Sequence, residues 1–165
     1  MIPESFRAQN RSVDNPDFVA HAEEVPGVAR ACMLTSNEDP GIQENEGHLL
    51  VVPEGGGYPS AVLKAAVLNK VTVEKPAPIT FQVSVMDPQY LQVDILAKVF
   101  RLPGTTPSAV GETLRALLES FFAVTLPSGE KNPAVSFGGG YKNSEGGADS
   151  SLPYSDVYNV IRDAE

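Results

Sequence analysis

Two neighbouring stretches near the middle of the chain alternate between apolar and polar residues. The apolar positions of the first are Ile79, Phe81, Val83 and Val85. Those of the second are Leu91, Val93, Ile95, Ala97 and Val99. A period of two residues is typical of a strand with one buried and one solvated face. Because Met86-Asp87-Pro88-Gln89 has the composition of a turn, we predict that Ile79–Met86 and Tyr90–Phe100 form an antiparallel hairpin at the centre of a sheet.

Helix and strand signals surround this hairpin. An Asx cap followed by proline at Asp14-Asn15-Pro16-Asp17 predicts a helix start, and Val25-Pro26-Gly27 predicts its end. The further expected elements are strands over residues 28–34 and 48–52, helices from about residues 60 and 107, and a last helix from Asp156 capped by Ser155. The helix from about residue 60 places Leu63, Val67 and Val71 on one face.

These elements predict an α+β fold. With one apolar sheet face, we expect a two-layer sandwich with a mostly antiparallel sheet and helices on one face only. The other sheet face is expected to be polar and open to solvent or a neighbouring subunit. Residues 1–13 are interpreted as a polar tail or linker, and residues 14–165 as one α+β assembly domain. The acidic, glycine-rich loop 142–152 is expected to be flexible.

A short internal echo accompanies the helix starts. Pro59-Ser60-Ala61-Val62 recurs 48 residues later as Pro107-Ser108-Ala109-Val110. Each copy is expected to follow a strand and to open an amphipathic helix. The echo therefore suggests an internal duplication of a strand–helix unit.

The charge balance argues against two classes of partner. The chain carries 12 basic and 21 acidic residues, for a net charge of -9. Nucleic-acid and anionic-lipid binders need clustered Lys and Arg, so we expect no nucleic-acid partner. No apolar run approaches the roughly 18 residues that span a bilayer, so we expect no direct membrane insertion. The single cysteine, Cys32, is predicted to be a buried, inert thiol.

No catalytic, cofactor or metal motif is found. Gly55-Gly56-Gly57 before a helix lacks the Lys-Ser/Thr ending of a phosphate loop. One cysteine and two separated histidines, His21 and His48, do not make a zinc site without carboxylates. No Gly-x-Ser-x-Gly elbow occurs. The sequence therefore predicts a protein that is not an enzyme, with no cofactor and no metal.

Four stretches, read in order, resemble the baseplate J-like family of contractile phage tails and related injection systems. They are Asn15-Pro16-Asp17-Phe18 through Pro26-Gly27-Val28-Ala29-Arg30-Ala31, Leu50-Val51-Val52-Pro53-Glu54-Gly55-Gly56-Gly57-Tyr58-Pro59-Ser60, Leu91-Gln92-Val93-Asp94-Ile95, and Phe137-Gly138-Gly139 followed by Tyr154 through Ile161. The resemblance covers roughly residues 12 to 165. Family members usually continue beyond the last helix, so the chain is expected to be a fragment from the C-terminal part of a longer protein.

The resemblance implies structural work in a baseplate wedge. It implies a protein made in the bacterial cytoplasm and assembled into a virion tail or tail-like particle. Its partners would be other baseplate or tail subunits, in hetero- and homo-oligomeric contacts. The family carries no catalytic residues, so none are carried over.

The candidate sites are therefore contact residues. We expect a protein interface at Gln82 and Gln92 on the polar sheet face, and at Phe137, Tyr154 and Tyr158 farther along, because aromatic residues are enriched at interfaces. The alternative is a small α+β ligand-binding domain or enzyme of unknown substrate, which would need a concave apolar pocket with convergent polar groups. Screening by NMR against metabolites would separate the two.

Overall fold

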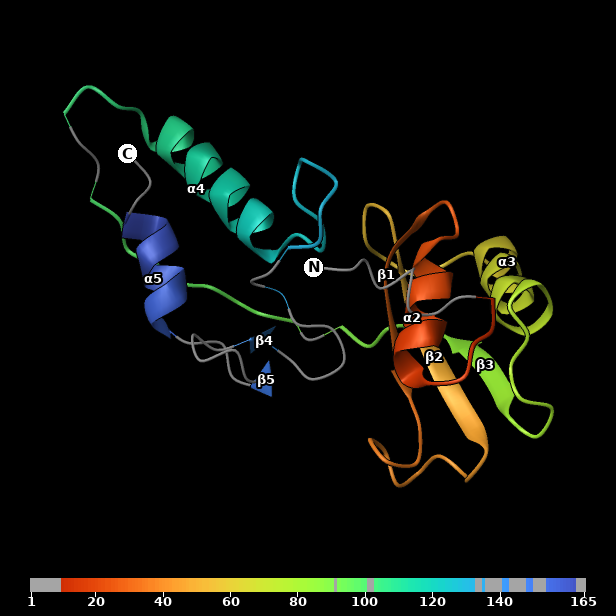
Figure 1. Ribbon diagram of the computed structural model, residues 1–165. Coiled ribbons are helices and arrows are strands. Elements are labelled where there is room, and N and C mark those ends of the chain that lie inside the picture. The colour runs from red at the N-terminus through yellow and green to blue at the C-terminus, as the bar shows by residue number, and fades with distance from the viewer. Residues whose placement is uncertain are drawn as a thin grey trace. The chain divides into compact units, whose positions relative to one another are not determined.

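The chain is of the α+β class, as predicted, with four α-helices and a three-stranded mixed sheet among the described residues. The computed structural model describes residues 10–90, 92–100, 103–132, 135, 141–142, 148–149 and 154–162. It divides the chain into two compact units, Met1–Pro88 and Gln89–Glu165, where the sequence was read as one domain over residues 14–165. Helices and strands carry the labels of Figure 1.

Helix α2 (Asn15–Glu23) opens the first unit at the predicted cap. The Asp14 carboxylate accepts from the Asp17 amide at 3.2 Å, and the Asp17 carboxylate accepts in turn from the Asp14 amide at 3.4 Å. This reciprocal box satisfies amides that have no partner within the helix. The helix ends before Pro26, also as predicted. Phe18 and Ala22 face inward and are fully buried.

The first unit contains one three-stranded sheet in the order β1–β2–β3. Strands β1 (Val28–Leu34) and β2 (Glu46–Pro53) pair antiparallel, and β3 (Gln82–Met86) pairs parallel to β2. Met33 lies opposite Leu49, which lies opposite Val85. These three positions therefore share one face of the sheet, and that face is apolar.

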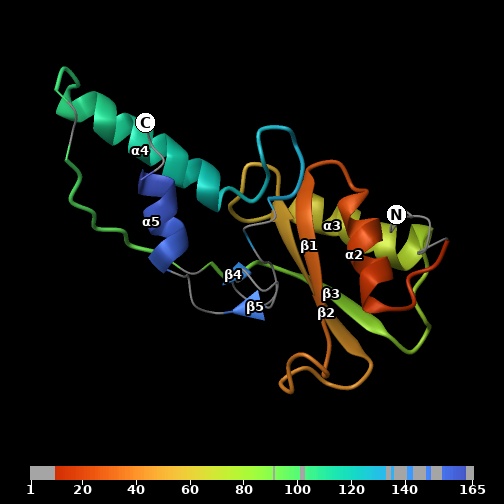
Figure 2. The same cartoon turned by 60° about the vertical axis from the view of Figure 1, so that its left-hand side comes forward.

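Helix α3 (Ala61–Asn69) and the π-helical turn η1 (Lys70–Glu74) connect β2 to β3. Ser60 caps α3 by accepting from the Leu63 amide at 3.2 Å. Val67 and Val71 are fully buried and Leu63 is partly buried, so the predicted inward face is confirmed. Figure 2 shows α2 and α3 on the same face of the sheet.

The core of the first unit fills the space between this sheet face and the helices. Its buried members are Phe18, Ala22, Val25, Val28, Ala31, Met33, Leu49, Val51, Val67 and Val71. At Gly47 the side chains of Met33 and Phe81 pack directly against the backbone of β2, since a Cβ at this position would overlap Met33 Cε and Phe81 Cζ. A side chain at this position would overpack the core, which is why the strand carries glycine.

The predicted hairpin is wrong. Strand β3 begins only at Gln82 and lies at an edge of the sheet. Among the described residues it pairs with β2 alone, in parallel. Ile79, expected to be buried, is fully exposed in a turn. Residues 92–100 form no ladder with any described residue. The sheet is consequently mixed and not mostly antiparallel.

Two local features explain this outcome. Pro76 and Pro78 lack backbone N–H groups and keep the chain out of a ladder until Gln82. The helical crossover α3–η1 returns the chain to the end of the sheet where β2 started, and such a connection produces a parallel pair. Val93 and Ile95 are 43% and 38% exposed, so the apolar positions of the second stretch do not form the buried face that their alternation predicts.

The second unit is built around helices α4 (Pro107–Phe122) and α5 (Tyr154–Arg162), which pack against each other. Thr106 caps α4 by accepting from the Ala109 amide at 3.3 Å. At the other end of α4, the buried Asn132 side chain donates to the carbonyls of Phe121 (3.0 Å) and Ala123 (2.8 Å). This amide satisfies helix-end carbonyls that have no partner within the helix.

Two predicted features fall largely outside the described residues. Phe137 is one of them. The loop 142–152 is the other, except for Lys142, which belongs to β4 (Tyr141–Lys142), and Ala148–Asp149, which form β5; these short strands pair antiparallel. The last helix begins at Tyr154, one residue before its predicted cap Ser155.

The internal echo does not extend to the helix caps. Ser60 is the N-cap of α3, whereas Ser108 lies inside α4, where its hydroxyl donates to Glu112 at 3.3 Å. Residues 92–100 and 103–106, which precede α4, also form no ladder with any described residue. The duplicated strand–helix unit and the two-layer arrangement of residues 14–165 therefore stay predictions.

Candidate protein interface

Tyr154 and Tyr158 form a stacked aromatic pair on the surface of α5. They lie four residues apart and so occupy one helix face. Their ring centroids are 6.2 Å apart with an angle of 25° between the planes. Tyr154 is 83% exposed and Tyr158 is 52% exposed. Val157 of the same helix is buried, so α5 is anchored by an apolar side chain next to the exposed tyrosines.

The two glutamines lie at separate positions in the chain. Gln82 starts β3 in the first unit and is exposed, opposite Glu46 of β2. Gln92 lies in the second unit, is also exposed, and donates to the Asp94 carboxylate at 3.1 Å. Of the predicted contact residues that are described, the structure thus brings together only the tyrosines.

The outer side of α3 is an exposed apolar surface that the sequence analysis missed. Its exposed side chains include Val62 (80%) and Leu68 (38%), with Ala65 and Ala66 between them, and Val73 (69%) follows on η1. A helix that is apolar on all sides is normally covered on all sides. The run Ala61-Val62-Leu63-Lys64-Ala65-Ala66-Val67-Leu68 carries this signal, because Lys64 is its only polar residue.

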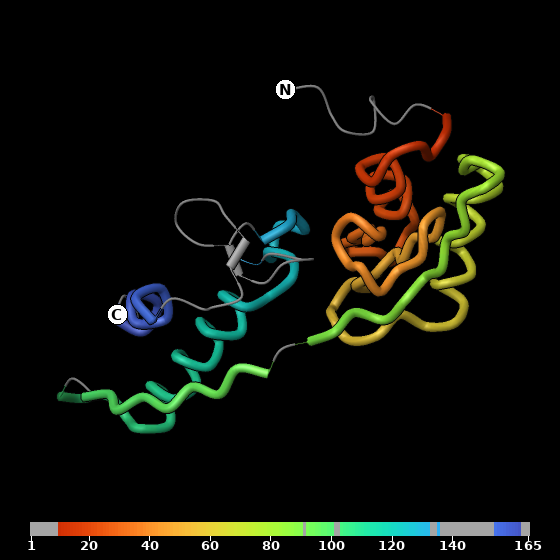
Figure 3. Tube along the Cα trace, turned by 90° about the horizontal axis from the view of Figure 1, so that it is seen from below, coloured from red at the N-terminus to blue at the C-terminus, as the bar shows by residue number. Residues whose placement is uncertain are grey.

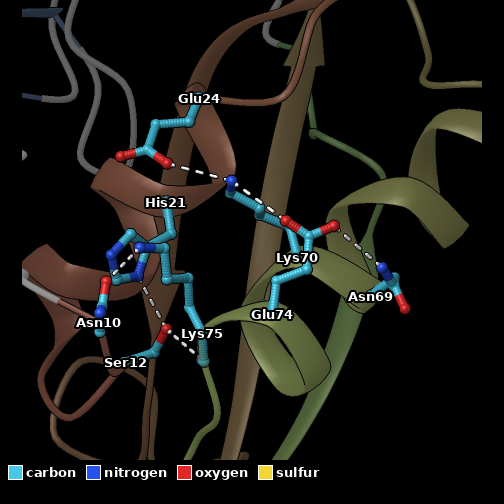
Figure 4. A network of polar contacts seen from close by, with 8 residues as sticks. All are labelled: Asn10, Ser12, His21, Glu24, Asn69, Lys70, Glu74 and Lys75. Carbon is cyan, nitrogen blue, oxygen red and sulfur yellow. Dashed lines mark hydrogen bonds and ion pairs between the residues drawn. The ribbon is translucent and has the colours of Figure 1, made fainter.

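A polar network joins the start of the first unit to α2 and η1 (Figure 4). Lys70 lies between two carboxylates, with its Nζ 3.2 Å from Glu24 and 3.3 Å from Glu74. Hydrogen bonds from Lys70 to Glu24 first, and then to Glu74, raise the pKa of its ammonium group. Lys75 Nζ donates to the Asn10 side chain at 2.9 Å. The network therefore holds residues 10–12 against the body of the unit.

The innermost members of this network are Ser12 and His21, both fully buried. The Ser12 hydroxyl donates to the Lys75 carbonyl at 3.0 Å, so the 3.0 Å contact with His21 is made by the Nδ1–H group of the ring. His21 Nε2 has no hydrogen-bond partner among the described residues. A buried serine that donates to a main-chain carbonyl is not presented to a substrate, so we assign this pair a structural role.

Residues able to bind a metal are not gathered in the described part of the chain. There, no group of three or more His, Cys, Asp or Glu side chains lies close enough together to hold an ion. None of the described helices is both long and apolar enough to cross a bilayer.

Cys32 lies on the sheet face away from the core, opposite Leu50, and is half-buried. Burial, and then the negative charge of Glu38, raise the pKa of its thiol. Less thiolate forms near neutral pH as a result, and the thiolate is the reactive species. We expect iodoacetamide to modify Cys32 several-fold more slowly in the folded chain than in the urea-unfolded chain, with the rate rising farther into the alkaline range.

The Glu38→Gln variant is the matched test of this cause. It removes the negative charge. It also weakens the two hydrogen bonds that the Thr35 hydroxyl and amide donate to the Glu38 carboxylate, which lower the pKa of that carboxyl. The modification rate should rise in this variant. Equal rates in folded and unfolded chains would contradict the assignment.

A scan against protein-family models finds no match to this chain, and a search of curated proteins finds none either. The fold and the exposed surfaces define a two-unit α+β chain with solvent-facing apolar and aromatic groups.

Proposed function

We propose that this chain is a structural component of a contractile tail baseplate, in a phage or a related injection system, and that it acts by binding neighbouring subunits. The observation that carries the proposal is the exposed, stacked pair Tyr154–Tyr158 on a helix that is itself anchored. The four stretches that resemble the baseplate J-like family, in the same order along the chain, indicate that the assembly is a baseplate. The protein would be made in the bacterial cytoplasm and incorporated into the particle.

The tyrosine pair has the physical properties of an interface anchor. An aromatic ring offers a large contact area while only two side-chain torsions need to be fixed. Stacking of the two rings restricts those torsions before a partner arrives, which lowers the entropic cost of binding. The phenolic hydroxyls leave each ring a polar group for hydrogen bonds at the rim of a contact.

The outer side of α3 adds a second contact surface on the other unit. Val62, Leu68 and Val73 expose apolar side chains there. A baseplate subunit has to contact several neighbours at once, and separate surfaces on separate units meet that requirement. Individually weak contacts become stable when several are made within one particle.

The test is particle assembly in the organism that encodes the chain. A strain lacking the gene is complemented with the wild-type gene or with Tyr154→Ala/Tyr158→Ala, and intact particles are counted by electron microscopy. We expect about a tenfold or larger loss of particles, because buried aromatic anchors are typical hot spots of interfaces. Asn159→Ala, an exposed change on the same helix, is the matched control and should assemble normally.

Thermal unfolding of the purified variants separates assembly from folding. Both tyrosine rings are largely exposed, so the double variant should unfold at the temperature of the wild type. Normal particle numbers in the tyrosine variant, with the α3 variant Val62→Ser/Val73→Ser also assembling normally, would refute the proposal.

A further inference from the structure

Residues 92–100 have the pattern of a strand but no partner strand in the part of the chain that the structure describes. They run extended in Figure 3 and form no ladder with any described residue. Their apolar side chains are exposed: Val93 43%, Ile95 38%, Leu96 102%, Val99 42% and Phe100 85%. A long, apolar and unpaired strand is a site for pairing with another chain.

The charges in this segment are placed four residues apart on one side. Asp94 and Lys98 are both exposed, and an extended chain separates such positions by about 13 Å. They are therefore too far apart to form an ion pair within one copy. Among the described residues, Asp94 accepts from Gln92, and Lys98 Nζ lies 5.5 Å from the centroid of the Phe100 ring. Neither charge forms an ion pair with a described residue.

The segment is complementary to itself when it is reversed. In an antiparallel pair of two copies centred on Leu96, Asp94 of each copy lies opposite Lys98 of the other. On the opposite face, Val93 meets Val99 and Ile95 meets Ala97. One face is then entirely apolar, and the other carries two opposite-charge pairs around a central leucine pair. Cross-strand pairs of both kinds stabilise a sheet.

We propose that residues 92–100 pair antiparallel with the same residues of a second copy, about a two-fold axis at Leu96. Such a contact is isologous, because the same surface serves on both chains, and it closes at a dimer. The register is specified by both faces, since a shift by one residue would place apolar side chains against charges. This inference goes beyond the proposed function and does not depend on it, since it stands on the residues of this segment alone.

The experiment is sedimentation equilibrium of the full chain at low ionic strength, with charge reversals. Asp94→Lys places lysines opposite lysines, and Lys98→Asp places aspartates opposite aspartates. We expect each single variant to weaken dimerisation by about tenfold or more, because two attractive pairs become repulsive. The double variant Asp94→Lys/Lys98→Asp restores both pairs and should dimerise like the wild type.

Mixing the two single variants tests whether the charges pair between copies, while the double variant tests the antiparallel direction, because a parallel pair would place like charges opposite each other in it. Each chain of the mixed pair then carries one sign of charge, and both cross-strand pairs are attractive. We expect a heterodimer to form from two variants that each stay monomeric, and it can be identified by fluorescent labelling of one of them. Of Leu96→Pro and Ala97→Pro, one should abolish dimerisation, because successive N–H groups point to opposite edges of a strand and one of these two is a ladder donor.

Three results would overturn the proposal. The first is a wild-type chain that remains monomeric at all attainable concentrations. The second is a dimer that responds to neither charge reversal. The third is a failure of both the double variant and the mixture to restore pairing, which would show that the segment pairs with another partner. Asp94 and Lys98 are exposed, so the single variants should unfold at the same temperature as the wild type. An unchanged unfolding temperature would show that their loss of dimerisation is not caused by misfolding.

Discussion

Phe18→Ala is expected to destabilise the first unit by about 3–5 kcal/mol, the range for removing a buried phenylalanine ring. Phe18 is 1% exposed and belongs to the core cluster. Its ring lies 5.5 Å from that of Phe81, at an angle of 39°. The substitution removes apolar contacts and leaves a cavity between α2 and the sheet. Since small domains are stable by about 5–15 kcal/mol in total, the variant should be close to the limit of folding.

Urea unfolding followed by circular dichroism measures this loss. Phe18→Leu keeps most of the apolar volume and should cost less than the alanine variant. Ile79→Ala is the matched surface control, because Ile79 is fully exposed, and it should change the free energy of unfolding by less than about 0.5 kcal/mol. Similar losses for Phe18→Ala and Ile79→Ala would show that Phe18 is not in the core.

The features that the sequence predicted well are those determined by neighbouring residues. The start of α2 follows from Asp14 and Asp17, three residues apart, which cap each other. The inward face of α3 follows from the four-residue spacing of Leu63 and Val67. The bounds of β1 were predicted without error, at Val28–Leu34. In each case the decisive interaction lies within one turn or one strand.

Strand pairing could not be predicted in the same way. Alternation shows which side chains share a face, but it does not show which strand is the neighbour or in which direction it runs. The pairing of β3 with β2 joins residues such as Val83 and Gly47, more than thirty positions apart. The turn-like composition of Met86-Asp87-Pro88-Gln89 predicts a local hairpin. In the structure β3 instead pairs with β2, to which it is connected by the longer crossover α3–η1.

The candidate interface was predictable only in part. Tyr154 and Tyr158 were predicted as contact residues because aromatic residues are enriched at interfaces, and their stacking is a finding of the structure. The apolar outer side of α3 was not predicted, because the four-residue spacing of Leu63 and Val67 indicates only the inward face of the helix. The Ser12–His21–Lys75 contact had no sequence signal, since Ser12 and Lys75 lie 63 positions apart and meet only in the folded chain.

Ser12→Ala removes the acceptor of the His21 Nδ1–H group and the hydroxyl that donates to the Lys75 carbonyl. Both ring nitrogens of His21 would then lack partners in a fully buried site, since Nε2 already has none among the described residues. A buried polar group left without a partner costs about 1–3 kcal/mol, so we expect a loss of at least this size.

Adding His21→Leu should then recover part of the loss. Leucine fills a similar space and removes both ring nitrogens at once, leaving only the Lys75 carbonyl without its donor. We therefore expect Ser12→Ala/His21→Leu to be more stable than Ser12→Ala alone, by about 1–3 kcal/mol. In the wild-type background the same leucine removes a satisfied hydrogen bond together with an unsatisfied nitrogen, so its effect there should be smaller.

Urea unfolding of the four proteins gives the coupling energy, which for directly contacting residues is about 0.5–3 kcal/mol. Amide hydrogen exchange at Ser12, whose N–H bonds to the Pro76 carbonyl at 3.4 Å, reports whether the segment stays attached. Exchange there should be fastest in Ser12→Ala and slower again in the double variant. Strictly additive free energies would contradict this, because two residues that satisfy each other's polar groups cannot be removed independently.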